Sequence, residues 1–175
     1  MHDDGVADAP FDAEKFEALA LERISEIDDG AVPEAMAVVF NVIRLANRMV
    51  QDLEAEVHRA MGWSWAGFRI MFALWVAGPL EPRAIAHLSA VTRASVSSVL
   101  NTLERDGLVE RKRESPDRRI VTVTLTPKGR RQVASAYRQQ NEREQAWVQG
   151  LSPADRHRLA ELLSELLRRP PLPTR

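Results

Sequence analysis

The fold is predicted most directly from residues 92–129, TRASVSSVLNTLERDGLVERKRESPDRRIVTVTLTPKG. This segment opens with Thr92, a residue type that caps helices, and apolar residues then recur at helical spacing until Gly107 ends the pattern. Residues 108–112 form a short strand candidate, and residues 120–125 are six β-formers in a row. We therefore predict a helix followed by a β-hairpin.

The residues before this segment supply another short helix. Glu81-Pro82 opens it, and Ser89-Ala90-Val91 joins it to the helix that we predict at 93–106. Two short helices joined by a three-residue turn are typical of a helix-turn-helix. A hairpin that follows such a pair directly is a wing, so the sequence predicts a winged helix-turn-helix.

The predicted helix 93–106 has one face that suits the major groove of DNA. Its apolar residues must face the core, which leaves small hydroxyl side chains, Arg93 and Asn101 on the opposite face. Arginine can donate two hydrogen bonds to the edge of guanine, and asparagine can hydrogen-bond to adenine or to a phosphate. The alternative is an ordinary solvated face, but residues 93–103 contain no acidic residue. We therefore expect this helix to contact DNA.

The tip of the predicted hairpin, residues 113–119, carries three arginines around a proline. Arginine at such a tip suits a narrow minor groove, where the negative potential is greatest. Asp117 lies among these arginines, and we expect it to pair with one of them and hold the shape of the tip. The predicted DNA-binding residues of the helix and the tip are Arg93, Ala94, Ser95, Ser97, Ser98, Asn101, Arg113, Arg118 and Arg119.

The net charge of −1 hides a strong charge polarity. Residues 1–34 hold eleven acidic and two basic residues, so their balance is −9 and the rest of the chain carries +8. Residues 105–131 alone hold nine basic and four acidic residues. A basic cluster of this kind attracts polyanions, nucleic acid first, although a salt-bridged solvated face is the alternative.

Residues 33–61 predict one long helix, because no glycine or proline follows Pro33 in this range. Apolar residues alternate at spacings of three and four, and a second stripe runs through residues 38–49. A helix that is apolar on two faces indicates two partners, its own domain and a second subunit; a plain central core helix is the alternative. The leucines of 159–167 form a similar stripe. The expected unbroken heptad seam is Met36, Val39, Ile43, Ala46, Val50, Leu53, Val57 and Ala60.

The residue inventory argues against an enzyme, a metal site and a cofactor. The chain has no cysteine, and its four histidines lie on separate predicted elements without metal-ligand spacing. Residues 62–66, GWSWA, resemble a nucleophile elbow, but that motif needs a preceding strand and a helix precedes these residues. We therefore predict that Ser64 caps the next helix. We expect this helix to be buried nearly all round as far as Gly78. The longest apolar run, 70–77, is too short to span a membrane. We expect a cytoplasmic protein.

Residues 98–126 resemble the signature region of MarR-family transcriptional regulators. The matching residues are 103–109, LERDGLV, then 117–119, DRR, and then Thr126 after six intervening residues. The resemblance extends over 33–168. It implies obligate dimers of winged helix-turn-helix subunits, held by their terminal helices, that mostly repress transcription and release DNA when a small, often aromatic, anion binds.

These expectations define a mainly α fold with a small β-hairpin wing, a winged helix-turn-helix domain plus a helical dimerisation region. The expected parts are an acidic N-terminal extension with a short helix at 1–32, a MarR-type domain at 33–168 and a tail at 169–175. Within the domain, the expected DNA-binding part is 64–125 and the dimerisation helices are 33–61 and 127–168.

The resemblance also implies an effector pocket near residues 40–75, between the dimerisation helices and the winged part. Arg69, the lone charge on an otherwise apolar helix, invites a carboxylate there. The alternative is that the tryptophans are core residues and that Arg69 pairs with Glu54 or Glu56. The urate-responsive subgroup has an aspartate where Arg69 stands, which argues against urate. The predicted ligand-binding residues are His58, Trp63, Trp65, Arg69 and Phe72.

The sequence thus predicts a homodimeric DNA-binding regulator, a repressor that a small aromatic carboxylate or phenol releases from a pseudo-palindromic operator in double-stranded DNA. Two alternatives stay open. One is a DNA-binding protein of the same fold without an effector. The other is a winged-helix module for protein interaction, in which the wing docks on an acidic partner.

Overall fold

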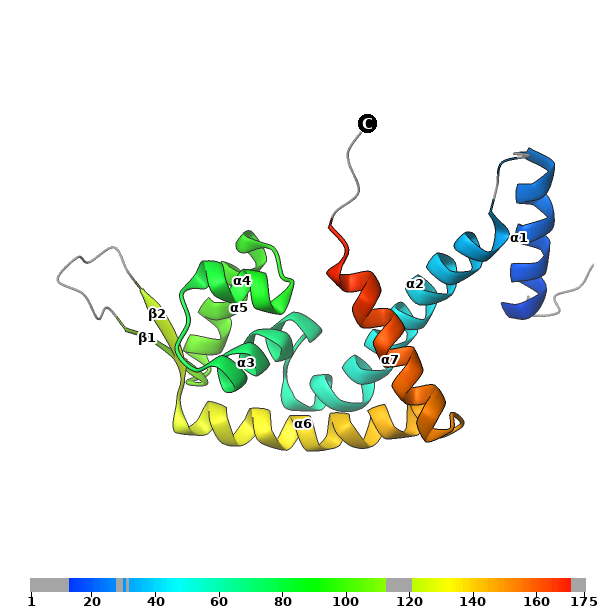
Figure 1. The fold of residues 1–175 in the computed structure, drawn as a ribbon. Coiled ribbons are helices and arrows are strands. Elements are labelled where there is room, and N and C mark those ends of the chain that lie inside the picture. The colour runs from blue at the N-terminus through cyan, green and yellow to red at the C-terminus, as the bar shows by residue number, and fades with distance from the viewer. Residues whose placement is uncertain (1–12, 28–29, 31, 113–120, 171–175) are drawn as a thin grey trace, which may run out of the picture. The chain divides into compact units, whose positions relative to one another are not determined.

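A computed structural model describes residues 13–27, 30, 32–112 and 121–170 (Figure 1). The chain divides into two compact units, 1–51 and 52–175, which we describe separately. The elements are α1 (Ala13–Ile27), α2 (Pro33–Leu53), η1 (Glu54–His58), η2 (Arg59–Met61), α3 (Trp65–Ala77), α4 (Pro82–Ser89), α5 (Arg93–Arg105), β1 (Val109–Lys112), β2 (Thr122–Leu125), α6 (Pro127–Val148) and α7 (Pro153–Arg168). This mainly helical fold with one small sheet confirms the predicted fold class.

The first unit consists of α1 and most of α2. The Phe16 ring of α1 stacks on Phe40 of α2 with 5.8 Å between ring centroids, and Asn41 Nδ2 donates to Glu17 Oε1 at 3.0 Å. The apolar residues along α2 stay largely in water nevertheless. Those with exposed side chains are Val38, Val39, Val42, Ile43 and Leu45.

The expected unbroken helix over 33–61 is wrong in its last third. After Leu53 the helix widens into a π-helical turn, η1, and then tightens into a 3₁₀ turn, η2, before Gly62. A π turn uses more residues than the 3.6 of an α turn, so the heptad seam loses its register at this point. Val57 and His58 consequently face the core of the second unit, where both are buried.

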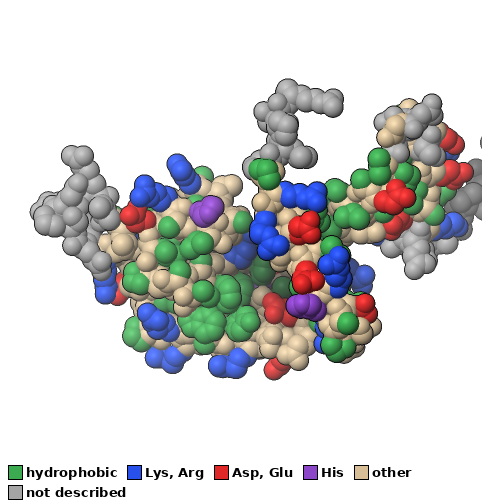
Figure 2. Space-filling view, viewed as in Figure 1, with side chains coloured by type: hydrophobic (Ala, Val, Ile, Leu, Met, Phe, Trp, Pro, Cys, Tyr) green, Lys and Arg blue, Asp and Glu red, His purple; other side chains and the backbone are tan. Residues whose placement is uncertain are grey.

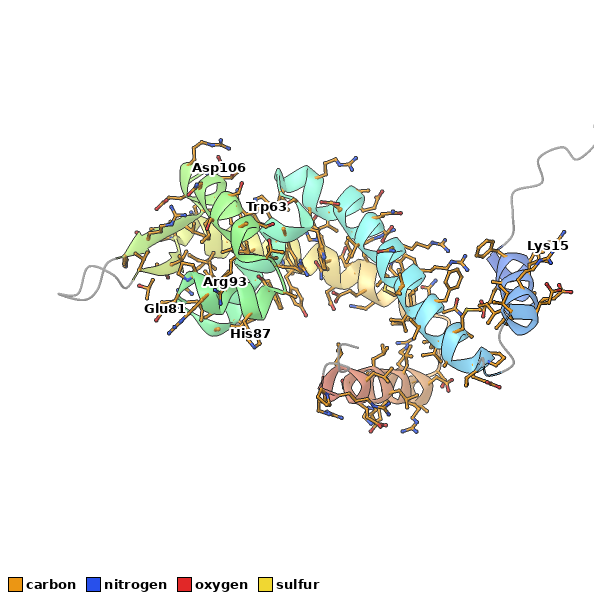
Figure 3. All side chains as sticks on the ribbon, turned by 90° about the horizontal axis from the view of Figure 1, so that it is seen from above. Lys15, Trp63, Glu81, His87, Arg93 and Asp106 are labelled. Atoms are coloured by element: carbon orange, nitrogen blue, oxygen red, sulfur yellow. The ribbon has the colours of Figure 1, made fainter. Side chains whose placement is uncertain are left out.

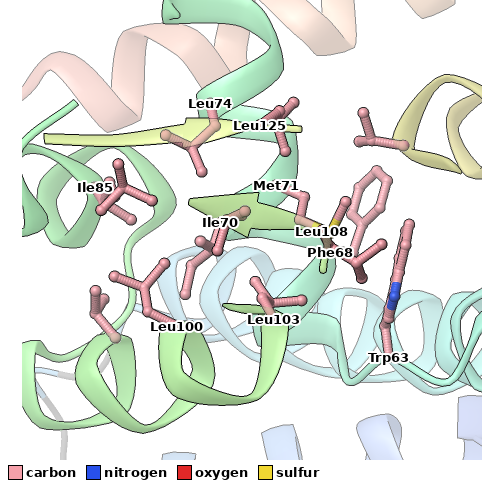
Figure 4. Packing of buried hydrophobic residues seen from close by; sticks show 14 of the residues in the cluster. Trp63, Phe68, Ile70, Met71, Leu74, Ile85, Leu100, Leu103, Leu108 and Leu125 are labelled. Carbon is pink, nitrogen blue, oxygen red and sulfur yellow. The ribbon is translucent and has the colours of Figure 1, made fainter. Parts of the chain in front are cut away.

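The second unit is built around one hydrophobic core, which α3 crosses (Figure 4). Ile70, Met71 and Leu74 of α3 are at most 1% exposed, and they pack with buried residues of α4, α5, both strands and α6. The strands pair antiparallel from Val109↔Leu125 to Lys112↔Thr122, and Leu80 forms a bridge to Val123. The elements therefore follow the order of a winged helix-turn-helix.

The predicted helix caps Ser64 and Thr92 are confirmed, and two further helices begin in the same way. Ser64, Thr92, Thr126 and Ser152 each accept a hydrogen bond from the backbone amide three residues later, at 3.0–3.2 Å. Each thereby satisfies an amide that the first helical turn leaves without a partner. Ser64 is thus the cap of α3.

Two helical faces lie in water. The expectation that α3 is buried nearly all round is wrong for its last turn, because Trp75 and Val76 lie at the surface, 37% and 67% exposed. Figure 2 shows hydrophobic side chains gathered on this face of the winged part. Every residue of α7 is exposed as well, including the leucine stripe Leu159, Leu162, Leu163, Leu166 and Leu167.

Candidate nucleic-acid interface

The helix α5 presents one face to solvent because its other face is held in the core. Val96, Leu100 and Leu103 are at most 2% exposed, and they anchor the inner face. The six residues predicted to contact DNA on this helix are all exposed: Arg93, Ala94, Ser95, Ser97, Ser98 and Asn101. Figure 3 labels Arg93 at the first residue of the helix. The sequence pattern therefore places these residues on a single accessible surface.

The turn before α5 is fixed by its backbone and by one arginine. Ala90 ends α4 in the left-handed conformation, at φ 50°, which non-glycine residues adopt infrequently. Arg69 Nη2 donates to the carbonyl oxygen of this residue at 3.2 Å, and Val91 is buried next to it. Arg69 thus connects α3 to the turn before α5.

The wing is tied to α5 by Arg111 of β1. Its Nη1 donates to Glu104 Oε2 at 2.6 Å, and its Nη2 donates to Asn101 Oδ1 at 2.8 Å. Sequence reasoning missed this link. The available signal was the place of Arg111 in the strand, two residues after the buried Val109, which directs both side chains to the same side of the sheet.

The end of α5 is joined to the start of α6. Thr126 Oγ1 donates to the carbonyl oxygen of Gly107 at 2.8 Å, and Lys128 Nζ donates to that of Asp106 at 2.9 Å. Gly129 lies so close to the backbone of Leu108 that a Cβ atom there would come within 2.0 Å of the Leu108 carbonyl oxygen. The first turn of α6 therefore packs tightly against residues 106–108, the turn that follows α5.

The predicted contacts at the wing tip lie outside the described residues. This applies to Arg113, Asp117, Arg118 and Arg119. The last described pair before the tip is Lys112↔Thr122. Lys112 is half-exposed, and its Nζ lies 3.1 Å from Glu110 Oε1.

The predicted ligand-binding residues lie in one row of aromatic rings and around two separate hollows. His58, Trp65 and Phe72 belong to one row of aromatic rings that passes through Phe68, with centroids 4.3–5.8 Å apart. Phe72 also lines a mainly apolar hollow of about 320 Å³ together with Arg69. Trp63 lines a different hollow of about 250 Å³, beside Ser98 and Asp106 on and just after α5. The structure thus brings Arg69 and Phe72 together and leaves Trp63 apart.

Arg69 forms no ion pair with a carboxylate of the described chain. Glu54, one expected partner, instead accepts a hydrogen bond from the backbone amide of Trp65 at 2.9 Å. The Arg69 guanidinium lies 5.7 Å over the Trp65 ring, and its Nε is buried without a hydrogen-bond partner among the described residues. Arg69 is therefore a cation at the edge of an apolar hollow with unused donor capacity.

A second arginine joins α6 to the end of α2 within the second unit. Arg143 contacts the Asp52 carboxylate through both Nε and Nη2, and Trp147 Nε1 donates to Asp52 Oδ2 at 2.9 Å. These partners are 91 and 95 residues apart in the sequence. No local sequence pattern predicts a contact between residues so far apart.

Comparisons with known proteins agree on the family. The MarR family model matches residues 63–121. The uncharacterized HTH-type transcriptional regulator YwaE of Bacillus subtilis is 32% identical over 133 residues, 76% of this chain and 78% of that protein. The HTH-type transcriptional repressor YetL of the same organism is 25% identical over 85% of this chain and 87% of its own.

A solved structure gives the same result. BpsR of Bordetella bronchiseptica, whose DNA binding is regulated by 6-hydroxynicotinic acid, is 27% identical and superimposes with a TM-score of 0.68. The match covers 74% of this chain and 98% of BpsR. Among the described helices, none is both long and apolar enough to cross a bilayer. The relatives are DNA-binding transcriptional regulators and not enzymes, and this chain belongs to the MarR family of winged helix-turn-helix transcriptional regulators.

Proposed function

We propose that this regulator is a homodimeric repressor that binds a pseudo-palindromic operator and leaves it when a small aromatic anion binds. The observation that carries the DNA-binding part is the exposed face of α5. It presents Arg93, three hydroxyl side chains and Asn101, with no acidic residue before Glu104. Such a face can enter the major groove without repelling the phosphates.

In this proposal the helix and the wing have different tasks. Arg93 and Ser97 read base edges in the major groove, where a bidentate contact discriminates between bases by about 1–3 kcal/mol. Arg118, in the wing tip, contacts phosphate and the minor groove. An Arg118→Ala variant therefore loses affinity for all DNA alike, and the slope of its salt dependence falls by about one.

Two apolar faces support a homodimer. The leucine stripe of α7 and the apolar residues of α2 are exposed in the single chain, and soluble monomers seldom leave contiguous apolar surface uncovered. A two-fold dimer covers such faces with copies of themselves. It also carries two recognition helices, which matches half-sites about 34 Å apart, one turn of DNA.

The hollow beside Arg69 and Phe72 supports an anionic, aromatic effector. An aromatic acid gains apolar contact there and supplies the acceptor that the Arg69 guanidinium lacks. BpsR offers a precedent, because its regulator is an aromatic carboxylic acid. Arg69 also donates to the Ala90 carbonyl oxygen in the turn before α5, so an acid that binds at Arg69 lies against this turn. The binding free energy for DNA then weakens by no more than the difference between the ligand's binding free energies for the DNA-free and the DNA-bound protein.

The repressor role rests on kinship, since one relative, YetL, is a repressor. A regulator with this role acts in the cytoplasm, where its operator lies.

The experiment is a fluorescence anisotropy titration of duplex DNA from upstream of the protein's own gene, against random duplex, with and without a panel of aromatic carboxylates. We expect selective binding, release by at least one acid, and quenching of tryptophan fluorescence by the same acid. Selective binding that no acid affects favours a regulator without an effector. Absence of selective binding favours the protein-interaction module.

Arg69→Ala tests the site itself. We expect DNA binding to persist while release and quenching are blunted, with Arg83→Ala, an exposed arginine of α4, as the matched control. An unfolded Arg69→Ala protein, or unchanged release by an identified acid, places the effector elsewhere.

A further inference from the structure

The contact between the wing strand and the recognition helix involves a base-reading candidate directly. Arg111 reaches Asn101 and Glu104 together, and these partners lie three residues apart on α5, on one side of the helix. The side chains of Arg111 and Glu104 are 30% and 38% exposed, so this ion pair is partly withdrawn from water. Asn101 itself is exposed.

The chemistry of Arg111 decides which end of the Asn101 amide faces it. A guanidinium has five donors and no acceptor. The amide atom that faces Arg111 must therefore be the oxygen, as the 2.8 Å contact to Oδ1 has it, and the amide nitrogen is directed away. We propose that Arg111 is a positioning residue for DNA recognition, which fixes Asn101 with its Nδ2 donors free for acceptors on DNA, either purine N7 or a phosphate oxygen.

The same contact removes an obstacle to DNA binding. Glu104 is the only acidic residue of α5, and a free carboxylate at this position repels phosphates. The charge of Arg111 neutralises it inside the protein, so Arg111 does not serve as an independent phosphate contact. Lys112, the next residue of the strand, differs in being half-exposed and in pairing with Glu110 of its own strand.

The inference rests on the proposed role of α5 in reading DNA, and a double-mutant cycle separates the two. Asn101→Ala, Arg111→Met and the double variant are made in a Glu104→Gln background, because removal of Arg111 otherwise frees the Glu104 carboxylate. Binding to duplex DNA from upstream of the protein's own gene, and to random duplex, is measured by anisotropy at several salt concentrations. Lys112→Met is the control.

We expect each single variant to lose about tenfold in its preference for the upstream duplex, equivalent to about 1.4 kcal/mol. The double variant should be no more than about threefold worse than either single variant, because both remove one interaction. Effects that multiply to about a hundredfold overturn the proposal. So does a fall of about one in the salt slope from wild type to the variant that carries both Glu104→Gln and Arg111→Met, since this pair has no net charge and a lower slope marks a direct phosphate contact.

Arg111→Lys keeps the charge and protects the fold, but it lacks the fork that reaches both partners at once. We expect it to lose preference for the upstream duplex while its salt slope and thermal midpoint stay near those of wild type; retention of the full preference overturns the proposal. Wild-type discrimination is measured first. Its absence overturns this inference together with the proposed function, whereas normal discrimination with multiplying effects overturns the positioning role alone.

Discussion

The core around α3 and the leucine stripe of α7 are both rich in apolar residues, yet they relate to water in opposite ways. Ile70, Met71 and Leu74 are almost fully buried by their own chain, whereas Leu159, Leu163 and Leu166 keep more than a third of their surface exposed. The first region can fold by its own contacts. The second gains its hydrophobic stabilisation only when another surface covers it. The free energy of unfolding and the association of subunits should therefore respond to different substitutions.

The largest expected effect is in the core. Ile70→Ala removes a side chain with no exposed surface and should lower the free energy of unfolding by about 2–5 kcal/mol. Chemical denaturation at several protein concentrations measures it. Val76→Ala is the control, because this side chain is 67% exposed and lies outside the proposed dimer surface, and we expect about 0.5 kcal/mol or less. Equal losses in the two variants contradict the distinction between the regions.

Charging the leucine stripe should dissociate the protein. Leu163→Glu places a carboxylate in the middle of the proposed dimer surface, where burial of an unpaired charge is unfavourable by several kcal/mol. Sedimentation at micromolar concentration should show dimers for wild type and none for the variant, together with lower stability. Ser164→Glu adds the same charge on the other side of α7 and should leave the dimer intact. Sedimentation of wild type as a folded monomer at this concentration contradicts the dimer proposal.

A smaller effect is expected at the joint between α5 and α6. Gly129→Ala forces its new Cβ against the carbonyl oxygen of Leu108, and such overpacking lowers stability by about 1–3 kcal/mol. A Cβ atom at Gly150, between α6 and α7, meets nothing within 4 Å. Gly150→Ala should therefore be close to neutral in thermal unfolding. If Gly129→Ala leaves the thermal stability unchanged, residue 129 is not tightly packed against Leu108.

The smallest effect is a pH dependence that separates a core histidine from a surface one. Burial lowers the pKa of His58 below its ordinary 6.5, against the opposing influence of the Glu54 carboxylate. The unfolded chain then binds more protons than the folded one, so stability is full above pH 6.5 and declines as the pH falls through that value. His58→Phe should flatten this decline, measured as the thermal midpoint between pH 7 and pH 5.

His157 supplies the control for this pH experiment. It lies exposed on α7, and His157→Gln should keep the wild-type decline. Identical pH profiles for wild type and His58→Phe contradict the assignment.

Local signals explain how far the sequence predicted the fold. The side chains of Ser64, Thr92 and Thr126 cap helices, so these residue types indicate where helices begin. Gly107 follows α5 with φ 69°, a conformation that ends helices. Each signal acts within a few residues, so it can be read along the chain. The α5 surface followed from the same periodicity.

The missed features depend on residues that are distant in the sequence or on a change of helix type. The Arg143–Asp52 contact joins residues 91 apart, and the Arg111–Asn101 contact crosses from a strand to a helix. The π turn after Leu53 interrupts a pattern that was itself regular. The predicted ligand-binding residues line more than one hollow for a related reason, because the count of aromatic residues does not tell which of them face the same hollow.

The tight contact at Gly129 has a consequence along the whole of α6. Thr126, Lys128 and Gly129 hold the first turn of α6 against residues 106–108, the turn that follows α5. At about 1.5 Å per residue the 22 residues of α6 span about 33 Å, and a tilt of about 5° at the joint moves the far end by about 3 Å. Val133 and Ala136 of α6 are buried in the core, so they resist a tilt of this size. We therefore expect α6 to keep its angle to the turn that follows α5.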